Sequence, residues 1–187
     1  MDEAALIRRA RQGETSAWEP LMLAHQEAVF RLAYLLLGDS DDAEDVAQET
    51  FVRAWRNVGR FDLERPLRPW LLRIAAHLCS NRRRSASRHL DALVRAFRRD
   101  PAPAGSIEDA AAKRTEAQQL RIALQGLSIA DQQILYLRYF LDLPLEEAAE
   151  ALSIPSGTAK SRSSRALARL RETLMRAFPD VLAGSEQ

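Results

Sequence analysis

Apolar side chains recur at steps of three or four residues along most of the chain, a spacing that predicts amphipathic helices. The first series predicts a helix that ends at Gly38, and it comprises Trp18, Leu21, His25, Val29, Leu32 and Leu36. A second series runs from Val46 to Trp55. Before it, Asp41 and Glu44 have the three-residue spacing of a capping box, which predicts where the second helix begins.

Residues 58–69 lack helical spacing and contain Gly59, Pro66 and Pro69, so we predict a loop there. A third helix is predicted to start near Pro69, with an apolar face made of Trp70, Leu71, Ile74, Ala75 and Leu78. Its other face would bring together Arg73, His77, Asn81 and Arg84. Trp70 could be a wedge that enters stacked DNA, but its place in the apolar series favours a core residue.

A stretch from Asp100 to Gly105 is rich in proline and alanine and cannot continue a helix. Helical spacing resumes near Leu120 and again after Ser128, a predicted N-cap. The chain has no alternating strand pattern and no tandem repeat. The predicted fold class is therefore all-α, with two small helical domains joined by a flexible linker. The predicted boundaries are residues 1–86, 87–112 for the linker, and 113–187.

Residues 144–174, PLEEAAEALSIPSGTAKSRSSRALARLRETL, have the pattern of a helix-turn-helix. A short amphipathic helix is followed by a break from Ser153 to Pro155 and by a longer basic helix. In such units the second helix enters the major groove and its first residues reach the base edges. The candidate DNA contacts are Ser156, Gly157, Thr158, Lys160, Ser161, Arg162 and Arg165. A purely structural helical hairpin would have the same pattern.

The formal net charge of +1 conceals blocks of like charge, which are typical of proteins that bind nucleic acid. Residues 36–50 contain only acidic charges, namely Asp39, Asp41, Asp42, Glu44, Asp45 and Glu49. Residues 65–88 and 155–171 contain only basic charges. The pattern predicts one acidic and two basic surfaces, although a single run of this kind is often just a solvated helix face.

The composition is that of a soluble protein, since 47% of the 187 residues are hydrophobic and 28% are charged. No apolar run approaches the roughly 18 residues that a membrane span requires, and the acidic start is unlike a secretory signal. We therefore expect a cytoplasmic protein without membrane insertion. Cys79 is the only cysteine, which excludes an internal disulfide and a cysteine-rich zinc site within this chain. We expect neither a metal nor a cofactor.

An enzyme would need a catalytic set, and the best available one combines Cys79 with His77, His25 or His89. Cys79 lies on or beside the apolar stripe of a predicted helix, where a lone cysteine is normally a packing residue. We therefore expect no enzymatic activity. A stand-alone regulator that binds an operator through the helix-turn-helix is the main alternative function, but it leaves the first domain unexplained.

Three motifs, in this order, resemble those of the bacterial RNA polymerase sigma factors of the extracytoplasmic-function (ECF) type, a subfamily of the sigma-70 family. Residues 42–55, DAEDVAQETFVRAW, are similar to the region 2 helix that contacts the polymerase clamp. Residues 69–84, PWLLRIAAHLCSNRRR, are similar to the helix that recognises the minus-ten promoter element. Residues 154–170, IPSGTAKSRSSRALARL, are similar to the region 4 recognition helix.

The resemblance implies a protein that binds core RNA polymerase and directs promoter-specific initiation of transcription. It implies that the beta-prime clamp is bound through Asp45, Gln48, Glu49 and Trp55, of which Trp55 is alternatively a core residue. It implies that minus-ten DNA is contacted and opened by Asp62, Leu63, Arg65, Arg68, Arg73, His77, Asn81 and Arg84. Region 4 would bind the minus-thirty-five duplex through the seven helix-turn-helix residues and would contact the beta flap. A partner anti-sigma factor is also implied.

Several positions depart from the family pattern. His77 and Asn81 stand where the family usually has asparagine and aspartate, which leaves the base preference of this helix open. In the helix-turn-helix, the family favours isoleucine, glycine, valine and leucine at the positions of Ala148, Ser153, Ala159 and Ser163. Each missing buried methylene removes about 0.8 kcal/mol, so we expect the second domain to be marginally stable alone.

Overall fold

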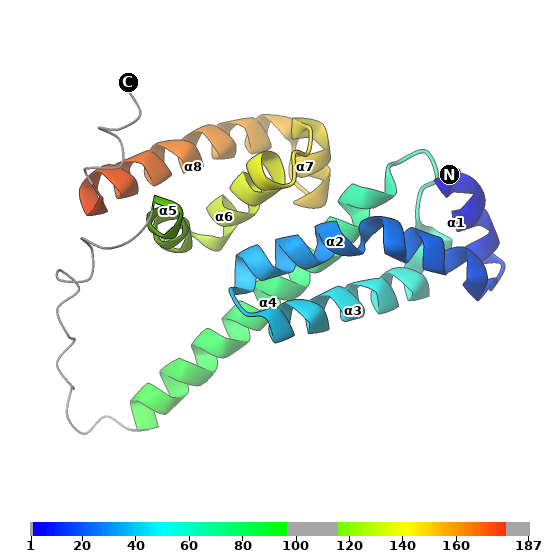
Figure 1. Ribbon diagram of the computed structural model, residues 1–187, viewed down its shortest axis with the longest axis horizontal. Helices are drawn as coiled ribbons and strands as arrows, with labels where there is room; N and C mark the ends of the chain where they lie inside the picture. Colours follow the sequence, from blue (N-terminus) through cyan, green and yellow to red (C-terminus); the bar gives the residue numbers. More distant parts are fainter. Residues whose placement is uncertain (1, 97–115, 179–187) are drawn as a thin grey trace.

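The computed structural model describes residues 2–96 and 116–178, with side chains for all of these except residues 87–96. All regular secondary structure in these ranges is helical (Figure 1). The elements are α1 (Glu3–Arg11), η1 (Thr15–Ala17), α2 (Trp18–Leu37), α3 (Ser40–Asn57), η2 (Val58–Arg60), α4 (Leu67–Ala96), α5 (Glu116–Gln125), α6 (Ile129–Leu135), η4 (Tyr136–Phe140), α7 (Leu145–Ala151) and α8 (Ser156–Ala177). We call α1 to α4 the first unit and α5 to α8 the second unit.

The first unit is a bundle in which α2, α3 and α4 pack against one another. The predicted series on α2 is buried, and Gly38 ends this helix with a φ of 77°, a left-handed conformation that glycine adopts without strain. The predicted capping box at Asp41 is wrong. The N-cap is Asp39, whose extended backbone lets its carboxylate accept a bond from the Asp42 amide at 2.9 Å. The helix therefore begins earlier, at Ser40, two residues after Gly38.

The second unit contains the predicted helix-turn-helix in α7 and α8. Ser128 caps α6 as predicted, since its hydroxyl accepts a bond from the Asp131 amide at 3.2 Å. The buried Asp131 carboxylate in turn accepts two bonds from Arg169, at 2.8 and 2.9 Å. This bidentate pair fixes α8 against α6. A π-helical turn, η4, follows α6, and its last bond joins the Leu141 amide to the Tyr136 carbonyl at 3.0 Å.

The cores of the two units are continuous, which the sequence did not predict. One hydrophobic cluster contains Leu21, Leu32 and Leu71 of the first unit together with Ile134 and Leu143 of the second. The second unit lies along α2 and α4, with α7 against α4 and α6 against α2 (Figure 1). The second unit thus gains apolar contacts that its own small core does not supply.

α4 is longer than the predicted helix. It continues to Ala96 and so includes the first part of the segment predicted as a linker. The stretch from Asp100 to Gly105, on which the linker prediction rests, lies outside the described residues. Among the described residues, we find no helix with the length and apolar character needed to cross a bilayer.

Ser153 in the turn between α7 and α8 has a φ of 54°. A left-handed conformation costs a residue with a Cβ about 1–2 kcal/mol, whereas glycine adopts it freely. We expect Ser153→Gly to raise the free energy of unfolding by about 1 kcal/mol, because the side chain is exposed and little contact is lost. Urea denaturation of the full chain measures this change, and an unchanged or lower stability would contradict the explanation.

Candidate protein and nucleic-acid interfaces

An apolar hollow of about 570 Å³ lies between α2 and α3. Trp18 and Met22 of α2 line one side, and Gln48, Val52 and Trp55 of α3 line the other. The Trp18 and Trp55 rings pack at 5.6 Å between centroids, so the half-buried Trp55 belongs both to the core and to the hollow. Val52 is 42% exposed. An exposed apolar hollow anchored by tryptophan is typical of a protein-binding surface.

The predicted acidic surface lies beside this hollow, and some of its carboxylates pair with arginines from outside the acidic segment. Arg82 of α4 lies 2.6 Å from Asp42 and 3.0 Å from Asp45. The hydrogen bond to Asp45 is the largest cause that raises the pKa of Arg82 above its ordinary value. Arg53 pairs with Glu49 at 2.7 Å, one turn along α3. The acidic surface is thus partly neutralised, because packing of α4 on α3 brings a residue of a separate basic block to the acids.

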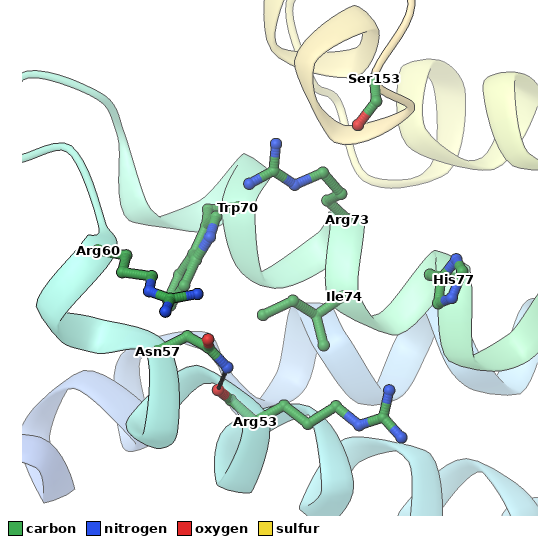
Figure 2. A pocket seen from close by; sticks show the side chains of 8 residues that line it. All are labelled: Arg53, Asn57, Arg60, Trp70, Arg73, Ile74, His77 and Ser153. Carbon is green, nitrogen blue, oxygen red and sulfur yellow. Dashed lines mark hydrogen bonds between the residues drawn. The ribbon is translucent and has the colours of Figure 1, made fainter.

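A second hollow, of about 520 Å³, lies between the end of α3, η2, α4 and the turn of the helix-turn-helix (Figure 2). Its lining residues are Arg53, Asn57, Arg60, Trp70, Arg73, Ile74, His77 and Ser153. The three arginines make its walls basic and suited to phosphate. Sequence reasoning missed the contribution of α3. The signal was present, because Arg53, Asn57 and Arg60 have the i, i+4, i+7 spacing of one helix face.

The residues predicted for minus-ten DNA fall into three places. Arg73 and His77 lie together in the basic hollow. Asn81 and Arg84 lie farther along α4 and are joined by a bond of 2.7 Å from the guanidinium to the amide oxygen.

The remaining four precede these along the chain, in the turn before α4 and its first residues. Asp62 pairs with Arg65 at 3.3 Å, and Leu63 is partly buried against the core. The Arg68 guanidinium donates to the Leu141 carbonyl of the second unit at 2.8 Å.

Trp70 is 9% exposed, and its ring packs on Phe61 with 4.9 Å between centroids. Its edge reaches the basic hollow, where Figure 2 shows it between Arg60 and Arg73. The prediction that Trp70 is a core residue is therefore confirmed.

The first turns of α8 present the seven residues predicted for duplex DNA. Ser156, Gly157, Lys160, Ser161 and Arg165 are exposed, and Thr158 and Arg162 are half-buried. Lys160, Arg162 and Arg165 have no ion pair with any described residue. Arg165 instead donates to the Ser161 carbonyl at 3.1 Å, which holds it along the helix surface. The N-cap residue of α8 is Pro155, whose side chain makes no cap bond to the first amides of the helix. Exposed cations beside a helix N-terminus form a surface suited to phosphates.

Cys79 is fully buried, and desolvation raises the pKa of its thiol to about 12. The neutral thiol is a poor nucleophile. His25, one of its proposed partners, bonds to Glu3 at 2.9 Å, and the side chain of His89 lies outside the described residues. Among the residues that the structure describes, no three acidic, histidine or cysteine side chains are grouped to hold a metal.

We expect iodoacetamide to leave Cys79 unmodified in the folded chain at mildly alkaline pH, because its thiolate is strongly disfavoured. Full modification is expected in urea. Mass spectrometry of the intact chain reads out both states. Rapid alkylation of the folded protein would contradict this buried environment.

Comparisons with known proteins assign a family region to each unit. Residues 21–89 match the family model of Sigma-70 region 2, and residues 123–172 match that of Sigma-70, region 4. The ECF RNA polymerase sigma factor SigW of Bacillus subtilis is 30% identical over 176 residues, which cover 90% of this chain and 94% of SigW. The ECF RNA polymerase sigma factor SigL of Mycobacterium tuberculosis is 31% identical over 173 residues, which cover 91% of this chain and 96% of SigL.

Two solved structures have the same fold. CnrH, in complex with the cytosolic domain of CnrY, matches with a TM-score of 0.68 and 26% identity over 93% of this chain and 97% of CnrH. The sigma factor RpoE of Bartonella quintana, in complex with the anti-sigma factor NepR, matches with a TM-score of 0.65 and 27% identity. That match covers 83% of this chain and 95% of RpoE. The similarity thus extends over both units.

Proposed function

The chain belongs to the ECF RNA polymerase sigma factors, and on this premise we propose which of its surfaces bind core polymerase and which bind promoter DNA. The observation that carries the proposal is that an apolar surface and two basic surfaces lie on different helices of one chain. The apolar hollow lies between α2 and α3, while the basic surfaces lie on α4 and on α8. A protein that joins an enzyme to DNA needs both kinds of surface.

The apolar hollow would bind the beta-prime clamp. Val52 and Trp55 would supply the buried contacts, and Gln48 a polar contact at their edge. Asp45 and Glu49 would lie at the rim, where exposed ion pairs contribute little to stability. Their carboxylates could exchange Arg82 and Arg53 for basic groups of the clamp at small cost.

The first turns of α8 would bind the minus-thirty-five duplex in its major groove. Arg162 and Arg165 are suited to guanine edges or phosphates, and Lys160 to phosphate. The N–H groups at the start of the helix, which Pro155 does not cap with its side chain, would bind a further phosphate. Contact between the beta flap and the second unit would hold this duplex beside the polymerase.

The basic hollow and α4 would bind the non-template strand of the minus-ten element. Unstacking a base costs a few kcal/mol, while stacking and hydrogen bonds return roughly 1–3 kcal/mol per base. The first unit alone therefore gains little by opening DNA. The upstream duplex and polymerase raise the effective concentration of the promoter at this surface, so opening is driven by shared binding energy and not by a catalytic side chain.

The solved relatives support a regulatory partner, because RpoE was crystallised with an anti-sigma factor. We propose that an anti-sigma factor of this chain covers the apolar hollow and thereby blocks the clamp. Because its target is RNA polymerase, the chain would act in the cytoplasm.

The test is whether core polymerase and the full chain co-elute as a complex in gel filtration. We expect a stoichiometric complex that forms without DNA. A chain that binds duplex DNA specifically but never elutes with core polymerase would contradict the proposal, and it would instead favour a stand-alone regulator.

A further inference from the structure

A side chain of α1 binds the turn that joins α3 to α4. The Arg11 guanidinium donates through Nε to the Val58 carbonyl at 3.0 Å, and a second nitrogen of the same group donates to the Phe61 carbonyl. These carbonyls stand 47 and 50 residues after Arg11 in the sequence. In space, α1 lies beside η2 at one end of the first unit (Figure 1). One guanidinium therefore holds both ends of the short stretch from Val58 to Phe61.

The helix that carries Arg11 is itself fixed to the first unit. Ile7 and Ala10 of α1 are each 2% exposed and belong to the hydrophobic core. At the other end of α1, the Glu3 carboxylate bonds to the imidazole of His25 on α2 at 2.9 Å. Arg11 is the last residue of α1. Its long side chain thus extends to the turn from a backbone that cannot easily move.

The segment that begins at Phe61 has little regular structure of its own. Residues 61–66 include no helix, and the side chains at positions 62, 64, 65 and 66 are exposed. Two short turns order its backbone. The Phe61 amide donates to the Val58 carbonyl at 3.2 Å, and the Arg65 amide donates to the Asp62 carbonyl at 3.1 Å. A segment with few buried contacts opens easily, so a bond at its first residue strongly affects its order.

Phe61 connects this turn to the surface proposed for minus-ten DNA. Arg11 holds its carbonyl, and its ring packs on Trp70 with 4.9 Å between centroids. Trp70 in turn lines the basic hollow (Figure 2). Residues 62–65, directly after Phe61, include three that are predicted to contact minus-ten DNA. Arg11 does not line the hollow, and it acts on the DNA surface through the backbone of Phe61.

We propose that Arg11 is a positioning residue for minus-ten DNA: it holds the Val58 and Phe61 carbonyls and thereby keeps residues 61–66 in the conformation that receives an unstacked base. The inference rests on the proposed function of that surface. A segment that is ordered in advance loses less conformational entropy when it binds. A wrong base leaves the segment unbound, so this advantage applies to the correct base alone and increases base discrimination.

Arg11→Met is the test variant, because it removes the guanidinium and keeps an unbranched apolar stem on α1. The matched control is Arg8→Met on the same helix, where Arg8 is exposed and lies 3.8 Å from Asp2. Both variants lose one positive charge, so a general loss of attraction to DNA cancels in the comparison. Circular dichroism and a urea melt of each variant establish that it is folded.

The first readout is hydrogen exchange of the Phe61 and Arg65 amides in the free full chain, followed by NMR. These two amides close the two turns of the segment. We expect both to exchange about tenfold faster in Arg11→Met than in Arg8→Met, the factor that corresponds to loss of order in roughly one residue of backbone. Equal exchange rates in the two variants overturn the proposal. This measurement uses neither polymerase nor DNA, so its failure leaves the proposed function standing.

The second readout is the promoter preference of holoenzyme made with each variant. Transcription is measured from templates that carry single base changes in the minus-ten or the minus-thirty-five element. We expect Arg11→Met to discriminate about tenfold less well at a minus-ten position, with unchanged discrimination in the minus-thirty-five element and unchanged affinity for core polymerase.

A merely structural defect would weaken polymerase binding and the use of both promoter elements together. That result overturns the proposal, as does full minus-ten discrimination by Arg11→Met. If Arg8→Met also shows no dependence on the minus-ten bases, the proposed function of the surface is contradicted, and this inference with it. The control variant thus separates the two failures.

Discussion

Val52→Glu is expected to lower the affinity of the chain for core polymerase by about 100-fold and to abolish transcription that depends on it. Val52 lies in the apolar hollow beside Trp55 and is 42% exposed. In the complex, a glutamate there would be buried without a partner, at a cost of about 3 kcal/mol, which corresponds to this loss. In the free chain it remains in water, so the free energy of unfolding should change little.

Leu23→Glu is the matched control, because Leu23 is 59% exposed on α2 and does not line the hollow. Fluorescence titration of labelled chain with core polymerase measures both affinities. Equal affinities for the two variants would place the clamp on a different surface. A large decrease in the free energy of unfolding of the Val52→Glu variant would mean that Val52 is a core residue.

Combined replacement of Lys160, Arg162 and Arg165 by alanine is the second large change. Each cation that contacts phosphate contributes about 0.9 to the slope of log affinity against log salt, and an arginine bonded to a guanine contributes about 1–3 kcal/mol of discrimination. We expect holoenzyme carrying this variant to bind an active promoter at least tenfold more weakly, with a slope shallower by about 2.

Arg176→Ala is the control on the same helix, since Arg176 is exposed near its C-terminal end and pairs with Glu172 at 2.6 Å. Fluorescence anisotropy over a salt series gives both the affinity and the slope. An unchanged slope for the combined variant would show that α8 does not meet the DNA backbone through these residues.

The helices were predictable because each buries one face, so that apolar residues recur every three or four positions in the sequence. The helix cap at Ser128 could be predicted, because the capping side chain and the amide that it binds are close in sequence. The cap of α3 was predicted at the wrong residue, because two aspartates near its start can serve as the N-cap. Asp39 caps α3 in place of Asp41 because the left-handed Gly38 directs the chain into an extended residue just before the helix.

The contact between the two units was not predictable, because it depends on side chains without a periodic signal. Gln132 and Gln133 resemble surface residues in the sequence, and their partners across the contact are the Arg83 guanidinium and the Ala76 carbonyl. Arg82 likewise meets Asp45 only through packing of α4 on α3. By contrast, the seven residues of the recognition helix could be placed, since a helix-turn-helix fixes its exposed turn locally.

Transcription in vitro by core polymerase, with and without this chain, tests the central claim most directly. On a set of candidate promoter templates, we expect transcripts from defined start sites only when the chain is present, none with Val52→Glu, and normal amounts with Leu23→Glu. Identical transcripts with and without the chain, on templates that the chain nevertheless binds, would contradict the account.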